Sequence, residues 1–188
     1  RGRKSFRRDG CPWRNYKPEG RADVATDREW SDAYLAQAKE DLTGAIAVQG
    51  RSTAVFAMLL QMSFEKFAKA QALRRGSYAR SYLASHHGIC EDFANALYNQ
   101  HLFIDGLGNK RVWDDAKYVI LALEKAHPAL AKAGPHLEYP WEDTNGKVLT
   151  PIKNLAIVQT LADATNRYAA NTIAFGKALS ENFHTIFR

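Results

Sequence analysis

The longest regular pattern of apolar positions in this chain lies between residues 51 and 76. Apolar residues recur there at intervals of three and four, which is the spacing of a helix with one broad buried face. The stripe contains Val55, Met58, Leu59, Met62, Phe67 and Ala70, and it is widened by Phe56, Leu60, Phe64 and Leu73. A face this wide predicts a central helix with neighbours on several sides. Arg74, Arg75 and Gly76 suit its C-terminal end.

Similar patterns predict four further helices. Thr26 and Glu29 form a capping box, which predicts a helix from about residue 27 to 49. The turn after Gly50 is short, so this helix and the next should be antiparallel neighbours. The other helices are expected over about 85–100, 112–126 with a further turn after Pro128, and 151–187.

These elements predict an all-α fold, an up-and-down bundle of about five helices that forms a single domain over residues 26–188. Residues 1–25 contain several Gly and Pro residues and are interpreted as an irregular N-terminal arm. A second Pro- and Gly-rich stretch, 134–151, predicts a loop with a tight turn at Asn145-Gly146 and short extended arms on either side.

Positive charge is concentrated in the N-terminal arm of a chain whose net charge is +6. Aromatic residues alternate there with basic ones, a combination that suits single-stranded RNA because cations bind phosphates while rings stack on bases. The candidate RNA-binding residues are Arg3, Lys4, Arg7, Arg8, Trp13, Arg14 and Tyr16. Two alternatives remain open: the arm is a solvated terminus, or its aromatic residues dock onto this domain or onto a partner subunit.

Composition argues against several other classes of protein. The two cysteines, Cys11 and Cys90, have no metal-binding or redox spacing, which favours a reducing compartment and a cytoplasmic location. No apolar run approaches the ~18 residues of a membrane span, and no apolar core of a signal peptide follows the basic start. No spacing of His, Cys or Glu predicts a metal site, and there is no glycine-rich phosphate loop, so we expect no cofactor.

Gln61, Glu65, Lys66, Lys69 and Ala70 form the pattern Q-x-x-x-E-K-x-x-K-A, which resembles a signature of the HEPN domain family. Upstream, the segment Ala38-Lys-Glu-Asp-Leu-Thr-Gly-Ala45 is similar to the pattern of its first helix, and His87-Gly-Ile89 has its His-x-aliphatic context. The resemblance covers residues 30–100 well and residues 113–188 only by helical pattern.

The resemblance implies an RNA-cleaving site. HEPN ribonucleases carry an Arg, usually followed by a polar residue, and then a His after a gap of four to six residues. Arg80, Ser81 and His86 or His87 match this motif. Family enzymes cleave RNA without metal, often as toxins or in defence, and usually join two motifs across a two-fold dimer. The implied partners are therefore RNA, a second copy of the chain, and possible nucleotidyltransferase or other partner chains.

The residue types suit this chemistry. A neutral imidazole can take the proton from a ribose 2′-OH, and a guanidinium can hold the phosphate. His87 is favoured over His86 because positions seven apart share one face if 80–87 is helical. In the alternative interpretation Arg80 is a surface charge and the histidines cap a helix or hydrogen-bond in the core.

Glu65 also has two interpretations. It forms a surface ion pair with Lys69 one helical turn later, or it faces the cleft of Arg80 and His87 and tunes it. The histidines at 101, 127, 136 and 184 are isolated in the sequence. The competing function for the whole chain is a non-catalytic helical module that dimerises or serves as a scaffold in a larger complex.

Overall fold

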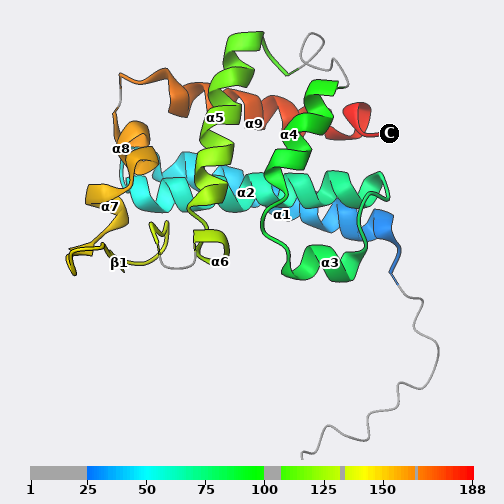
Figure 1. Cartoon of the computed structure of the whole chain (residues 1–188). Coiled ribbons are helices and arrows are strands. Elements are labelled where there is room, and N and C mark those ends of the chain that lie inside the picture. Colours follow the sequence, from blue (N-terminus) through cyan, green and yellow to red (C-terminus); the bar gives the residue numbers. More distant parts are fainter. Residues whose placement is uncertain (1–24, 100–106, 132–133, 164) are drawn as a thin grey trace, which may run out of the picture.

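The computed structural model describes residues 25–99, 107–131, 134–163 and 165–188 of the chain, and within them nine helices and one short hairpin (Figure 1). The all-α class predicted from the sequence is confirmed. In chain order the elements are α1 (Asp27–Val48), α2 (Thr53–Arg74), α3 (Arg80–Ser85), α4 (Cys90–Asn99), α5 (Lys110–Lys125), α6 (Pro128–Ala131), β1 (Trp141–Glu142), β2 (Val148–Leu149), α7 (Pro151–Asn154), α8 (Ala156–Ala162) and α9 (Arg167–Ile186).

Helices α1 and α2 form the predicted antiparallel pair (Figure 1). The capping box at the start of α1 is present, because the Thr26 hydroxyl accepts from the Glu29 N–H while the Glu29 carboxylate accepts from the Thr26 N–H. Two fully buried serines tie the helices together. Ser31 donates to the carbonyl of Ala70, and Ser63 donates to the carbonyl of Ala38, each at 2.8 Å. Both hydroxyls are therefore satisfied where the helices approach closely.

Helix α5 crosses in front of α2 and α9 at a steep angle in Figure 1, and it packs against both. Arg167 at the start of α9 forms a bidentate pair with Asp115 of α5, with N···O distances of 2.6 and 3.1 Å. Asn171 adds a third hydrogen bond to the same carboxylate. The described helices therefore include a crossing layer as well as the antiparallel pair, and an up-and-down bundle of five helices does not describe this arrangement.

Two predicted helices are shorter than expected. The segment predicted as one helix over 151–187 contains α7, α8 and α9, and between α8 and α9 polar side chains compete for the backbone N–H groups. Asp163 accepts from the backbone and the hydroxyl of Thr165, and Asn166 caps α9. The helix predicted from 85 begins only at Cys90, and the residues before it belong to α3 and a loop.

The core is centred on α2, as predicted, but the apolar residues of α2 that are most buried are not all those that the sequence pattern selected. Phe56, Leu60 and Phe64 are buried, whereas Met58 and Met62 are only half-buried and Val55 is exposed. Phe64 contacts Phe67 and stacks on Phe175 of α9. Gly176 allows this approach, since a Cβ there would lie 3.1 Å from Leu42 and 3.3 Å from Phe64.

The loop over 134–151 contains the predicted tight turn, in which Gly146 has a φ of 77° and Trp141 pairs with Leu149. The candidate RNA-binding residues of the arm, which precede Ala25, lie outside the described residues. In the part of the chain that the structure describes, no helix is both long and apolar enough to cross a membrane.

Candidate functional site

A buried carboxylate near the middle of α2 organises the site. One oxygen of Glu65 lies 2.7 Å from the Lys69 ammonium and 3.1 Å from Nδ1 of His87, and the other accepts from the Gln61 amide at 2.9 Å. The side chains of Lys69 and Glu65 are only 6% and 11% exposed. The ion pair of Glu65 with Lys69, for which the sequence suggested a surface position, is therefore buried.

The charge state of Glu65 follows from its partners. Burial on its own raises the pKa of a carboxyl, but hydrogen bonds from Lys69 and Gln61 and the charge of Lys69 together hold the pKa of Glu65 below its ordinary value. Glu65 is therefore ionised at neutral pH and can only accept hydrogen bonds.

The ionised Glu65 also determines which ring nitrogen of His87 carries the proton. Because the Glu65 carboxylate only accepts, Nδ1 of His87 carries the proton and Nε2 keeps its lone pair when the ring is neutral. The loop that carries His87 is held on both sides by the buried side chains of Leu83 and Ile89. The His87 side chain is 32% exposed, so a substrate can reach it.

His127 stacks on His87, with ring centroids 4.3 Å apart and planes 17° from parallel. Its Nδ1 accepts from the N–H of Ala129 at 3.2 Å, so the proton of the neutral ring is on Nε2. Burial, followed by the nearby His87, lowers the pKa of His127 below its ordinary value. When both rings are neutral, the site therefore presents one ring nitrogen that accepts a proton and one ring N–H that donates.

Glu65, His87 and His127 also lie close enough together to hold one metal ion. One ligand atom each from Glu65, His87 and His127 lies within 4.8 Å of the others, and these ligand types suit Zn²⁺. Their hydrogen bonds favour acid–base chemistry instead. A cation at Glu65 would face the buried ammonium of Lys69, and a cation on Nδ1 of His127 would displace the Ala129 N–H.

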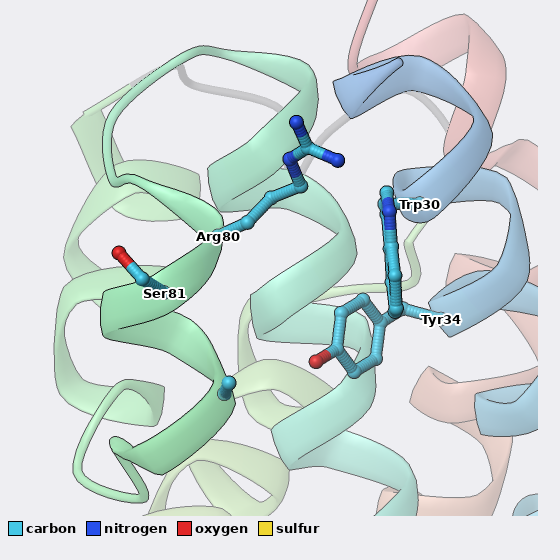
Figure 2. A pocket seen from close by; sticks show the side chains of 5 residues that line it. Trp30, Tyr34, Arg80 and Ser81 are labelled. Atoms are coloured by element: carbon cyan, nitrogen blue, oxygen red, sulfur yellow. The ribbon is translucent and has the colours of Figure 1, made fainter. Parts of the chain in front are cut away.

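Arg80 does not join this cluster in the described chain. Its guanidinium lies 2.9 Å from the Asp27 carboxylate and donates to the carbonyl of Ala25 at 2.7 Å, at the start of α1. The expectation that Arg80 and His87 share a helical face is wrong, because α3 ends at Ser85. Figure 2 shows the Ser81 hydroxyl pointing away from the Arg80 guanidinium.

His86 faces different neighbours from His87. Its ring stacks on Tyr82 with centroids 4.4 Å apart, and its Nε2 donates to the carbonyl of Gly88 at 3.0 Å. No hydrogen bond joins it to Glu65 among the described residues. This arrangement favours His87 as the proton acceptor, as the sequence did for a different reason.

His127 is the site residue that sequence reasoning missed. It lies 40 positions after His87 in the chain, and it is brought to the cluster because α5 crosses α2 and ends beside it. The next residue, Pro128, signals the end of α5 but says nothing about what His127 contacts. Gln61 and Lys69 belong to the quoted signature, although their hydrogen bonds to Glu65 could not be derived from it.

We expect Lys69→Met to lower the free energy of unfolding by about 3–5 kcal/mol, because it leaves the Glu65 carboxylate buried without its cation. The double variant Lys69→Met/Glu65→Gln should recover most of the loss. Lys110→Met is the matched control, since Lys110 forms an i,i+4 pair with Asp114 that is exposed and contributes little to stability. Denaturant unfolding measures all three, and equal losses in the two single variants would contradict the buried pair.

The lowered pKa of His127 predicts a pH dependence. In the unfolded chain His127 takes up a proton near pH 6.5, whereas in the folded chain its pKa is lower and the ring stays neutral at that pH. The contribution of neutral His127 to stability is therefore present above pH 6.5 and is lost as the pH falls towards the folded pKa. We expect His127→Asn to reduce the slope of unfolding free energy against pH between about pH 5 and 7, by up to ~1.4 kcal/mol per pH unit. The pKa of His127 also depends on its titratable neighbours, which are His87, Glu65, Glu138 and Lys69. The slope of the variant is therefore compared directly with the slope of the parent, which carries the same neighbours. Identical slopes would contradict a half-buried His127 that stays neutral in the folded chain.

Comparisons of the chain with protein-family models, with curated proteins and with solved structures found no match. The resemblance to HEPN domains therefore depends on the quoted residues alone. In this structure those residues link α1 to α2, through the ion pair of Asp41 with Lys66, and build the Glu65 cluster.

Proposed function

We propose that this chain is a HEPN-like RNA-binding protein that cleaves RNA without a metal ion, with His87 as the general base. The observation that carries the proposal is the hydrogen bond of His87 to buried Glu65, which leaves an accessible ring nitrogen with a lone pair beside the ring of His127. The Arg-x6-His spacing and the resemblance to HEPN domains add to it.

In the proposed step, Nε2 of His87 takes the proton of a ribose 2′-OH. The 2′ oxygen forms a bond to phosphorus, the bond from phosphorus to the 5′ oxygen breaks, and the leaving oxygen takes a proton from water. The products carry a 2′,3′-cyclic phosphate and a 5′-OH. Glu65 stabilises the imidazolium that forms on His87, and the N–H of His127 is available to a phosphate oxygen.

Arg80 enters this proposal through a second copy of the chain. Its guanidinium lies at the start of α1 rather than beside His87 in the described chain, so the paired motif that the resemblance implies requires a homodimer. The basic arm would supply further phosphate contacts. A toxin or defence role and a nucleotidyltransferase partner are implied by the resemblance only.

We expect cleavage of single-stranded RNA to persist in EDTA and to stop when the ribose at the cleavage position is 2′-deoxy. His87→Ala should lower the cleavage rate by about 100-fold or more, the usual scale for lost acid–base help, while RNA binding survives. His86→Ala is the matched control, because its ring contacts Tyr82 and Gly88 instead of Glu65. Its rate should equal that of the parent.

Cleavage by His87→Ala at the parent rate, or cleavage that EDTA abolishes, would contradict the proposal. No cleavage by the parent protein would favour the competing function, a non-catalytic dimerisation or scaffold module. In that case the Glu65 cluster serves only to hold α2, the loop after α3 and the end of α5 together.

A further inference from the structure

A second feature lies on the other side of Lys69. A pocket of about 260 Å³ opens between α1 and α3, lined by Trp30, Tyr34, Arg80, Ser81 and Ala84 (Figure 2). The Trp30 side chain is 45% exposed although it is a large aromatic group. The chemistry assigned to His87 uses none of these contacts apart from Arg80.

The shape of the pocket suits a flat ring. Trp30 and Tyr34 project from α1 and their ring centroids are 6.2 Å apart, with the planes tilted by 42°. The lining is mostly apolar. Its volume is below the ~300–1,000 Å³ of pockets for drug-sized ligands, which favours a single heterocyclic ring over a larger molecule.

The charge around the pocket favours an anion attached to that ring. Arg80 lies at its edge, and its ion pair with Asp27 joins two exposed side chains. An exposed pair of this kind contributes little stability, so a phosphate can replace Asp27 at small cost. The Lys69 ammonium lies 6.0 Å from the centre of the Tyr34 ring. A nucleotide offers both groups, a flat base and a phosphate joined to it through a sugar.

The pocket is connected to the proposed cleavage site. Lys69 contacts Tyr34 on one side and the Glu65 carboxylate on the other, and Glu65 holds His87. Arg80 at the pocket edge also donates to the carbonyl of Ala25, just before α1.

We propose that the pocket between α1 and α3 binds one unpaired base of the RNA substrate, with Trp30 and Tyr34 as stacking surfaces and Arg80 on an adjoining phosphate. This inference rests on the proposed function, whose substrate it makes more specific. Stacking on aromatic rings tolerates any base, so the pocket selects single-stranded over double-stranded RNA rather than a sequence.

The test uses a fluorescein-labelled 2′-O-methyl hexaribonucleotide, which lacks the attacking hydroxyl and cannot be cleaved. Fluorescence anisotropy measures its Kd with the full chain. We expect Trp30→Ala to weaken binding by about 5- to 150-fold, the range for one stacked base, and Trp30→Phe to keep most of the affinity. Tyr139→Ala is the control, because Tyr139 is an exposed aromatic residue remote in sequence from the pocket.

Two further measurements separate the roles of ring and charge. A hexamer of abasic residues should bind the parent and Trp30→Ala equally, since it offers no base to stack. Arg80→Ala should reduce the slope of log Kd against log salt by about 0.7, the value for one phosphate contact on a single strand. An unchanged salt slope would overturn the assignment of Arg80.

The outcomes distinguish this proposal from the proposed function. If His87→Ala abolishes cleavage while Trp30→Ala leaves the Kd unchanged, the base pocket is overturned and the ribonuclease stands. If Trp30→Ala weakens binding and no form of the protein cleaves RNA, the pocket stands and the ribonuclease fails. If Trp30→Ala leaves the Kd unchanged and deletion of residues 1–24 shifts the assigned indole N–H NMR signal of Trp30, the occupant is the chain's own arm, which overturns the proposal.

Discussion

The buried carboxylate of Glu65 constrains the rest of the site. A charge placed in the middle of the most buried helix is stable only when several donors surround it, and here the donors come from α2 itself and from the loop after α3. Gln61 and Lys69 are supplied at helical spacing, but His87 requires the chain to return to α2 after α3 ends. The proton position on His87 therefore follows from a requirement of folding, and the exposed lone pair that chemistry needs is a consequence of the same hydrogen bond.

Patterns of local origin were predicted well from the sequence. The capping box at Thr26, the antiparallel pair of α1 and α2, and the turn at Asn145-Gly146 each depend on residues close together in the chain. Features that depend on tertiary contacts were predicted poorly. The periodicity of α2 selected Met58 and Met62 along with the true core residues, because spacing alone cannot tell which part of a wide apolar face meets α9. The long helix predicted after Pro151 is broken because Asp163 and Asn166 bind backbone groups locally.

The residues of the candidate site were also predicted only in part from the sequence. Glu65 and His87 were selected from the sequence, and their contact is an observation of the structure. His127 could not have been selected, since its place beside His87 depends on the crossing of α5 over α2. The Arg-x6-His spacing suggested one catalytic surface, yet the end of α3 at Ser85 directs Arg80 towards α1 and His87 towards α2. The two residues of the motif therefore lie in different places. Arg80 lies beside the pocket of Trp30 and Tyr34, and His87 lies beside the Glu65 carboxylate. Lys69 contacts both Tyr34 and Glu65.

The proposed role of His87 as the base requires that Glu65 fixes its neutral ring as the tautomer with the proton on Nδ1. A long-range ¹H–¹⁵N correlation spectrum of the full chain, labelled on histidine and recorded at a pH where the ring is neutral, reports this directly. We predict the Nδ1–H form for His87 in the parent and loss of that preference in Glu65→Gln, where the acceptor is no longer charged. An Nε2–H form of His87 in the parent would contradict His87 as the base, because the nitrogen proposed to take the 2′-OH proton would already carry one.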